Sequence, residues 1–127
     1  MPDPRTNKVS CSSYHCEIEV TLEVLRGKWK ALILWNLHQH EVVRYNELRR
    51  LIPNVSQKML TQQLRDLEDH HLISRTVYNT VPPQVEYRLT EAGVALIPIM
   101  ESMDQWGKKY VTYYSEMESG KGEAQAE

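Results

Sequence analysis

The sequence predicts a mainly α fold with one small β-hairpin and a long C-terminal helix. Segments with helical spacing of apolar residues occupy the chain between residues 17 and 69. Two runs with period-two alternation, Ile73–Tyr78 and Val85–Leu89, then flank a turn-rich link, which is typical of a hairpin. A long apolar repeat follows Thr90 and indicates the C-terminal helix.

Size and composition place the chain among ordinary globular proteins. With 127 residues, 41% hydrophobic and 25% charged, it suits one domain or one domain plus an appended helix. No run approaches the ~18 apolar residues of a membrane span, and Met1–Ser13 lacks an apolar signal-peptide core. We therefore expect a cytoplasmic protein without membrane contact. We expect residues 1–15 to form a flexible arm, 16–118 the domain with its helix, and 119–127 a disordered tail.

Two helices are predicted before residue 40. Ile18, Leu22 and Leu25 recur at i, i+4 and i+7, which predicts a helix from about Glu17 to Leu25, ended by Gly27. A second helix from about Lys28 to His38 is apolar nearly all round, so we expect it to be the central core helix. One of its faces would consist of Trp29, Leu32, Ile33 and Asn36.

The order of the remaining elements predicts a winged helix-turn-helix. A short helix over Tyr45–Leu51 would bury Tyr45, Leu48 and Ile52 and end before Pro53-Asn54. Ser56 would cap a fourth helix from Gln57 to about Asp69, ahead of the hairpin. Thr90 would cap the last helix, from about Glu91 to Met117. A short helix, a break, a helix with a polar face and a two-stranded hairpin follow one another as in that fold.

The fourth helix carries the candidate readout face. Leu60, Leu64 and Leu67 would face inward, and the opposite side presents a polar stripe. Its Gln, Arg, Lys and Thr side chains suit major-groove readout, and Ser56 with the helix N-terminus could hold a phosphate. The alternative is an amphipathic helix with a merely solvated polar face. The candidate DNA-binding residues of this helix are Ser56, Gln57, Lys58, Thr61, Gln62 and Arg65.

Charge distribution favours duplex DNA as the partner despite a formal net charge of -2. Residues 26–65 contain eight basic and two acidic side chains, whereas the flanking segments are acidic. Candidate phosphate contacts are Arg44, Arg49 and Arg50, and candidate wing contacts are Arg75, Thr80 and Gln84. Uneven charge on a solvated surface and an inert hairpin loop stiffened by Pro82-Pro83 are the alternative interpretations.

Three stretches resemble the HxlR-type branch of the MarR-like winged-helix regulators. They read CEIEVTLEVLRGKWKALILWNL, RYNELRRLIPNVSQKMLTQQLRDLEDHHLISR and VPPQVEYRLTEAGVALIPIMESMDQWG, and together they cover about Cys16 to Trp106. The resemblance implies a bacterial dimeric transcription regulator that binds DNA. The chain departs from the family pattern at Glu17, where proline is expected. It also departs at His70-His71, where an acid or small residue and then glycine are usual.

The C-terminal segment predicts a dimer helix. A 4-3 heptad spacing joins Ala92, Leu96, Ile99, Met103, Trp106, Tyr110 and Tyr113, and this seam is longer than one small core needs. We expect it to pack on a symmetry mate, together with Ile18 and Leu22 of the first helix, and to kink at Pro98. A twofold dimer would place two readout helices about 34 Å apart and select an inverted repeat. The alternative is a helix that packs only on its own domain.

The cysteine pair offers an entry point for a signal. Cys16 lies just before the first helix, whose N-terminus would lower the thiol pKa, and the resemblance implies sensing of reactive electrophiles or oxidants at this place. Cys11 could act as a resolving partner within or between subunits. The alternative is that Cys16 is a small buried residue and Cys11 incidental. Neither the cysteines nor the five histidines have a metal-site spacing, and we expect no metal or cofactor.

These observations predict a sequence-specific regulator, a homodimeric repressor that responds to a small reactive effector. A winged-helix adaptor for protein partners, without DNA specificity, is the alternative, because that fold also serves protein recognition. An enzyme is not expected. The sequence offers no nucleophile-base pair, phosphate loop or paired carboxylates at a plausible site.

Overall fold

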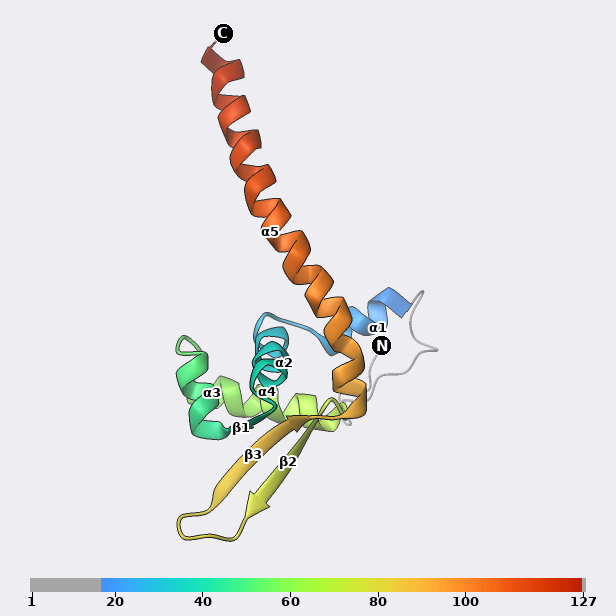
Figure 1. Cartoon of the computed structure of the whole chain (residues 1–127), viewed down its shortest axis with the longest axis vertical. Helices are drawn as coiled ribbons and strands as arrows, with labels where there is room; N and C mark the ends of the chain where they lie inside the picture. The colour runs from blue at the N-terminus through green and yellow to red at the C-terminus, as the bar shows by residue number, and fades with distance from the viewer. Residues whose placement is uncertain (1–16, 127) are drawn as a thin grey trace. The chain divides into compact units, whose positions relative to one another are not determined.

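The computed structural model describes residues 17–126, with side chains through residue 120. The predicted N-terminal arm with Cys11, and Cys16 directly after it, lie outside the described residues. The elements are, in order, α1 (Glu17–Val24), α2 (Trp29–His40), β1 (Val42–Arg44), α3 (Tyr45–Leu51), α4 (Gln57–Asp69), β2 (Ile73–Tyr78), β3 (Gln84–Leu89) and α5 (Glu91–Ala126) (Figure 1). This order confirms the predicted winged helix-turn-helix with a long C-terminal helix. The described chain divides into two units, which meet at Ile97 and Pro98.

Helix α2 lies at the centre of the first unit, as predicted. Ile33, Leu34 and Leu37 are fully buried, whereas Leu32, on the same predicted face as Ile33, is 42% exposed. An almost uniformly apolar helix has no polar side that orients it, so its packing against α4 and the sheet decides which face is covered. In α4 the prediction is confirmed, because Leu60, Leu64 and Leu67 are all buried.

The sheet has one strand more than predicted. Strand β1 was missed because three residues are too few to display an alternation. It pairs antiparallel with β3, with Val43 opposite Tyr87, and the strand order is β1-β3-β2. Glu41, with φ of 61°, turns the chain from α2 into β1. Because β1 leads directly into α3 and pairs with β3, the start of α3 lies beside the hairpin.

The β2–β3 hairpin projects beyond the helices of its unit as a wing (Figure 1). Its register runs from Ile73 opposite Leu89 to Tyr78 opposite Gln84, and β3 starts one residue before the predicted Val85. Only Ile73 of β2 is buried, so backbone pairing holds the rest of this strand. Burial raises the pKa of Tyr87 on β3 above its usual 10.0.

A compact junction joins α4, the sheet and the start of α5. The Thr90 hydroxyl donates to the His71 carbonyl at 2.6 Å and accepts from the Gly93 N–H at 3.2 Å, which confirms Thr90 as the cap of α5. His71 has a φ of 61°, a left-handed conformation that suits the glycine of the family pattern. A Cβ at Gly93 would collide with the backbone carbonyl oxygen of Leu72, so the close approach here requires glycine.

Helix α5 is longer than predicted. It continues past the predicted end at Met117 to Ala126. The physical reason is composition, because Glu, Lys, Ala and Gln in this segment favour helix and offset Gly120 and Gly122. The helix also runs through Pro98, although proline removes a backbone donor. The boundary between the two units falls at this proline.

Replacing Gly93 with alanine is expected to lower the free energy of unfolding by about 1–3 kcal/mol, because the new methyl group meets backbone rather than a movable side chain. Gly120→Ala is the matched control on the same helix, where an added Cβ meets nothing within 4 Å. Urea denaturation followed by circular dichroism measures both. Equal stability of the two variants would contradict the close packing at this junction.

Candidate nucleic-acid interface

The polar stripe of α4 faces outward, as predicted. Gln57, Lys58, Gln62 and Arg65 are exposed, while the leucines on the opposite side of the same helix are buried. Ser56 begins the helix as its cap, because its hydroxyl oxygen accepts from the Met59 N–H at 3.1 Å. Its own proton remains available to an outside acceptor. The N-terminal half of α4 therefore presents donors and acceptors, and its first turn contains no acidic residue.

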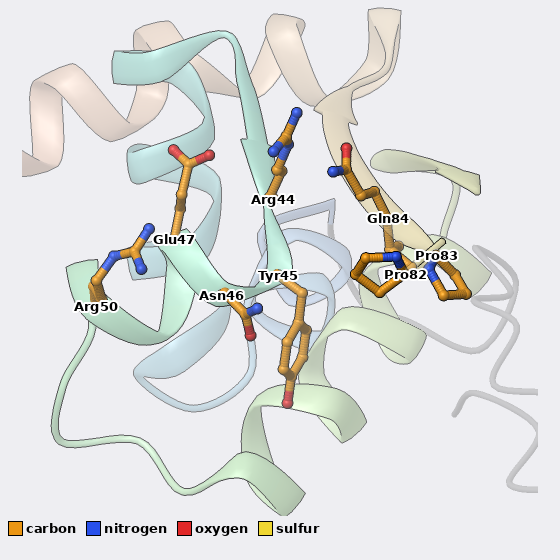
Figure 2. Close-up of a pocket in the computed structure, with 9 residues that line it drawn as sticks. Arg44, Tyr45, Asn46, Glu47, Arg50, Pro82, Pro83 and Gln84 are labelled. Carbon is orange, nitrogen blue, oxygen red and sulfur yellow. The ribbon is translucent and has the colours of Figure 1, made fainter. Parts of the chain in front are cut away.

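Thr61 is the one half-buried member of the stripe, and Tyr45 of α3 holds it. The Tyr45 hydroxyl lies 3.0 Å from the Thr61 hydroxyl and donates to the Gln57 carbonyl at 3.3 Å. Figure 2 shows the Tyr45 ring pointing from the start of α3 toward the neighbouring helix. From the sequence, Tyr45 is predicted only as a core residue. Its phenol is the signal that could have indicated more, because a half-buried tyrosine hydroxyl normally finds a partner.

Asp66 is a second polar contact that the sequence analysis missed. Its Oδ1 accepts from Gln62 Nε2 at 3.0 Å, and its Oδ2 lies 3.5 Å from the Lys30 ammonium. Lys30, on α2, is only 5% exposed. The carboxylate thus joins the core helix to the stripe. The i, i+4 spacing of Gln62 and Asp66, and a lysine inside an apolar helix, were the available signals.

The basic residues expected at phosphates fall into two groups. Arg49 and Arg50 are exposed in the last turn of α3. Arg44 and Arg75 are also exposed but have acidic neighbours, Glu86 at 3.8 Å and Glu68 at 3.7 Å. Exposed pairs of this kind contribute only ~0–1 kcal/mol, so a phosphate can compete for either arginine. The Arg75–Glu68 pair also connects the wing to α4.

A groove of about 450 Å³ separates the start of α3 from the wing loop. Three predicted contact residues, Arg44, Arg50 and Gln84, are brought together on its walls, while Arg49, Arg75 and Thr80 do not line it. The Thr80 hydroxyl instead donates to the Pro82 carbonyl at 2.7 Å inside the wing loop. The full lining, shown in part in Figure 2, is Arg44, Tyr45, Asn46, Glu47, Arg50, Pro82, Pro83, Gln84 and Val85.

Comparison with known proteins agrees with this arrangement. Residues 24–115 match the model of the HxlR-like helix-turn-helix family. The chain belongs to this family. The uncharacterized HTH-type transcriptional regulator YkvN of Bacillus subtilis (strain 168) is 50% identical over 110 residues, which cover 87% of this chain and 89% of that protein.

Two solved structures resemble this HxlR-like chain in sequence and fold. The HTH-type regulator ytcD is 50% identical with a TM-score of 0.72, and the match covers 76% of this chain and 98% of that one. The redox regulator HypR in its oxidized form is 46% identical with a TM-score of 0.69, and the match covers 74% and 96%. This HxlR-like protein is therefore a DNA-binding transcription regulator of the HxlR/MarR type and not an enzyme.

Two further observations concern other functional classes. Within residues 17–126, no three His, Cys, Asp or Glu side chains gather in a way that could hold a metal ion. In the same part of the HxlR-like chain, no helix has the length and apolarity needed to cross a membrane.

The predicted dimer seam is exposed in the single HxlR-like chain. Ile18 and Leu22 of α1 are 70% and 66% exposed, and Leu96 is half-buried. In the second unit, the Trp106 and Tyr110 rings stack with centroids 5.0 Å apart. The ring of Tyr114, which lies outside the predicted seam, packs next to Tyr110. The seam residues of that unit are all about half exposed or more, namely Ile99, Met103, Trp106, Tyr110 and Tyr113.

Proposed function

We propose that this protein binds specific operator DNA with α4 in the major groove and with the wing and α3 on the backbone. The observation that carries the proposal is the outward stripe on a helix whose other side is locked into the core. The N-terminal part of a readout helix meets the base edges, and here that part has no acidic side chain to repel phosphate. DNA is the partner, so the cytoplasm is the proposed location.

The side chains of the stripe suit different base edges. Gln57 and Gln62 can pair with adenine, Lys58 and Arg65 with guanine, and the Thr61 methyl group can contact thymine. Ser56, Arg44, Arg49 and Arg50 would bind phosphates, and these contacts set the register rather than read the sequence. Arg75, Thr80 and Gln84 would place the wing on the backbone or in the minor groove.

The active form in this proposal is a homodimer on an inverted repeat. The support is the long exposed stripe of apolar and aromatic side chains on α5, because such stripes on soluble proteins mark interaction surfaces. Ile18 and Leu22 of α1 would add to the same interface. A dimer bound across promoter DNA occludes polymerase, so repression is the proposed outcome.

Cys16 and Cys11 are the proposed sensor, by resemblance and because HypR, a structural relative, is named a redox regulator. Oxidation of the two thiols to a disulfide would transfer two electrons and two protons to an oxidant such as diamide. Strain at the dimer interface would then alter the spacing of the two readout helices. Alkylation of the Cys16 thiolate by an electrophile such as a quinone would act at the same place.

Arg65→Ala is expected to weaken binding to a duplex selected from random sequence by about 1–3 kcal/mol, because it removes one base contact. Arg26→Ala is the matched control, since Arg26 pairs with Glu23 on the α1–α2 link and not on the stripe. Fluorescence anisotropy over a range of salt concentrations measures affinity and salt slope. Wild-type protein indifferent to duplex DNA at low salt would favour the adaptor alternative, and equal losses in the two variants would refute the role of the stripe.

Tyr110→Glu is expected to convert the dimer to monomer and to abolish binding to a two-half-site operator, because it buries a charge in the seam. Thr112→Glu introduces the same residue two positions away, on an exposed part of α5 outside the seam, and should remain dimeric. Light scattering after size exclusion measures both masses. If the wild type is monomeric at micromolar concentration, the homodimer proposal fails.

Cys16→Ser is expected to keep operator affinity in the absence of oxidant and to lose the response to diamide or quinone. Cys11→Ser tests the resolving role and should lose the disulfide while it retains reaction with quinone. Gel-shift titration with and without each reagent measures the response. A Cys16→Ser protein as responsive as wild type would show that the sensor is elsewhere.

A further inference from the structure

One carboxylate, that of Asp66, lies between the core and the readout stripe. Its side chain is 17% exposed, and its two oxygens have different partners. Oδ2 faces the ammonium of Lys30 on α2 at 3.5 Å, and Oδ1 accepts a hydrogen bond from Gln62 Nε2 at 3.0 Å. The same group thus contacts a residue of the central helix and a proposed base-reading residue.

The ion pair with Lys30 fixes the position of the Asp66 carboxylate. The Lys30 side chain is only 7% exposed, and a buried ammonium is strongly unfavourable unless an anion compensates it. Lys30 lies on the turn of α2 next to the fully buried Ile33 and Leu34. Asp66 is therefore held from the core side, unlike an acid on a solvated helix face.

The hydrogen bond to Asp66 fixes the orientation of the Gln62 carboxamide. A carboxylate only accepts hydrogen bonds, so it selects the amide nitrogen of Gln62 and turns the carbonyl oxygen away from itself. The nitrogen keeps a second N–H. The free oxygen and this N–H are one acceptor and one donor, the pair that adenine requires in the major groove. Gln57 makes no such side-chain bond within the described part of the chain.

We propose that Lys30 and Asp66 are positioning residues that set the orientation of the Gln62 carboxamide and thereby the base preference of one operator position. This proposal rests on the proposed function, in which Gln62 reads a base. A contribution of Asp66 to affinity is unfavourable, because an acid on a DNA-facing helix repels phosphate. The acid at this place compensates the buried Lys30 ammonium, and its second oxygen then orients Gln62.

Asp66→Asn tests the orientation with little change of shape. To accept from Gln62, the new amide would have to turn its own NH₂ toward the Lys30 ammonium, donor against donor. The opposite rotamer presents NH₂ to Gln62 and requires the Gln62 oxygen there, which reverses the carboxamide. Asp69→Asn is the matched control, because it removes the same charge from an exposed position on the same helix.

The readout is binding to a panel of operators with single base-pair changes. Gln62→Ala first identifies the base pair at which Gln62 discriminates. Asp66→Asn is expected to reduce discrimination at that pair by about tenfold and to leave the other positions unchanged. In the Gln62→Ala background, Asp66→Asn should have no further effect there. Asp69→Asn should keep the wild-type preference at every position.

A second measurement needs no DNA and covers the case in which Asp66→Asn unfolds. In the free protein, the side-chain NH₂ of Gln62 should have a higher NMR order parameter than that of Gln57. Lys30→Met, which removes the ammonium and keeps much of the volume, should lower the Gln62 value toward that of Gln57. Equal order of the two amides in the wild type would overturn the proposal.

The outcomes separate this proposal from the proposed function. A wild type without base preference at any position would end the proposed function and this inference with it. If the wild type shows a Gln62-dependent preference that Asp66→Asn leaves intact, only the positioning role fails. It also fails if Asp66→Asn weakens all operators equally, or if its effect at that pair persists in Gln62→Ala.

Discussion

The burial of three leucines of α4 in the core is the constraint on which the remaining geometry depends. Leu60, Leu64 and Leu67 lie one helical turn apart and are all covered. Because their side is fixed, the opposite side has to face outward, and the polar stripe cannot rotate into the interior. At ~2–5 kcal/mol for truncation of each such leucine, the orientation of the helix is strongly enforced. The surface that would meet DNA is thus a consequence of the core.

Helix-breaking and helix-capping residues explain why some elements were predictable from the sequence alone. The bounds of α3 and α4 were predicted because Pro53-Asn54 breaks the chain and Ser56 caps the next helix, and both signals act within a few residues. The stripe followed from helical spacing. The covered face of α2 was not predictable, because an all-apolar helix is oriented by its neighbours. Strand β1 exists through its pairing with β3, which is distant in the sequence.

In the candidate site too, features within one helix were predictable, and contacts between distant segments were not. Spacing along one helix was enough to select the exposed stripe residues, whereas the contacts that hold them come from other elements. Tyr45 reaches Thr61 from α3, and Lys30 reaches Asp66 from α2. Such pairs depend on how helices cross, which a sequence without tertiary information does not specify. The end of α5 was predicted too early for a different reason, since the residues after Met117 are polar and show no apolar repeat.

Glu86 has a consequence for how the wing could engage a phosphate. This largely covered carboxylate is paired with two guanidinium groups at once, Arg44 at 3.8 Å and Arg88 at 3.9 Å. If Arg44 turns toward an incoming phosphodiester, Glu86 keeps a cation beside it and is not left as an uncompensated anion. Arg88 therefore acts as a reserve counter-charge. When Arg44 moves from Glu86 to a phosphate, Arg88 still balances the Glu86 charge. The electrostatic cost of separating Arg44 from Glu86 is therefore lower.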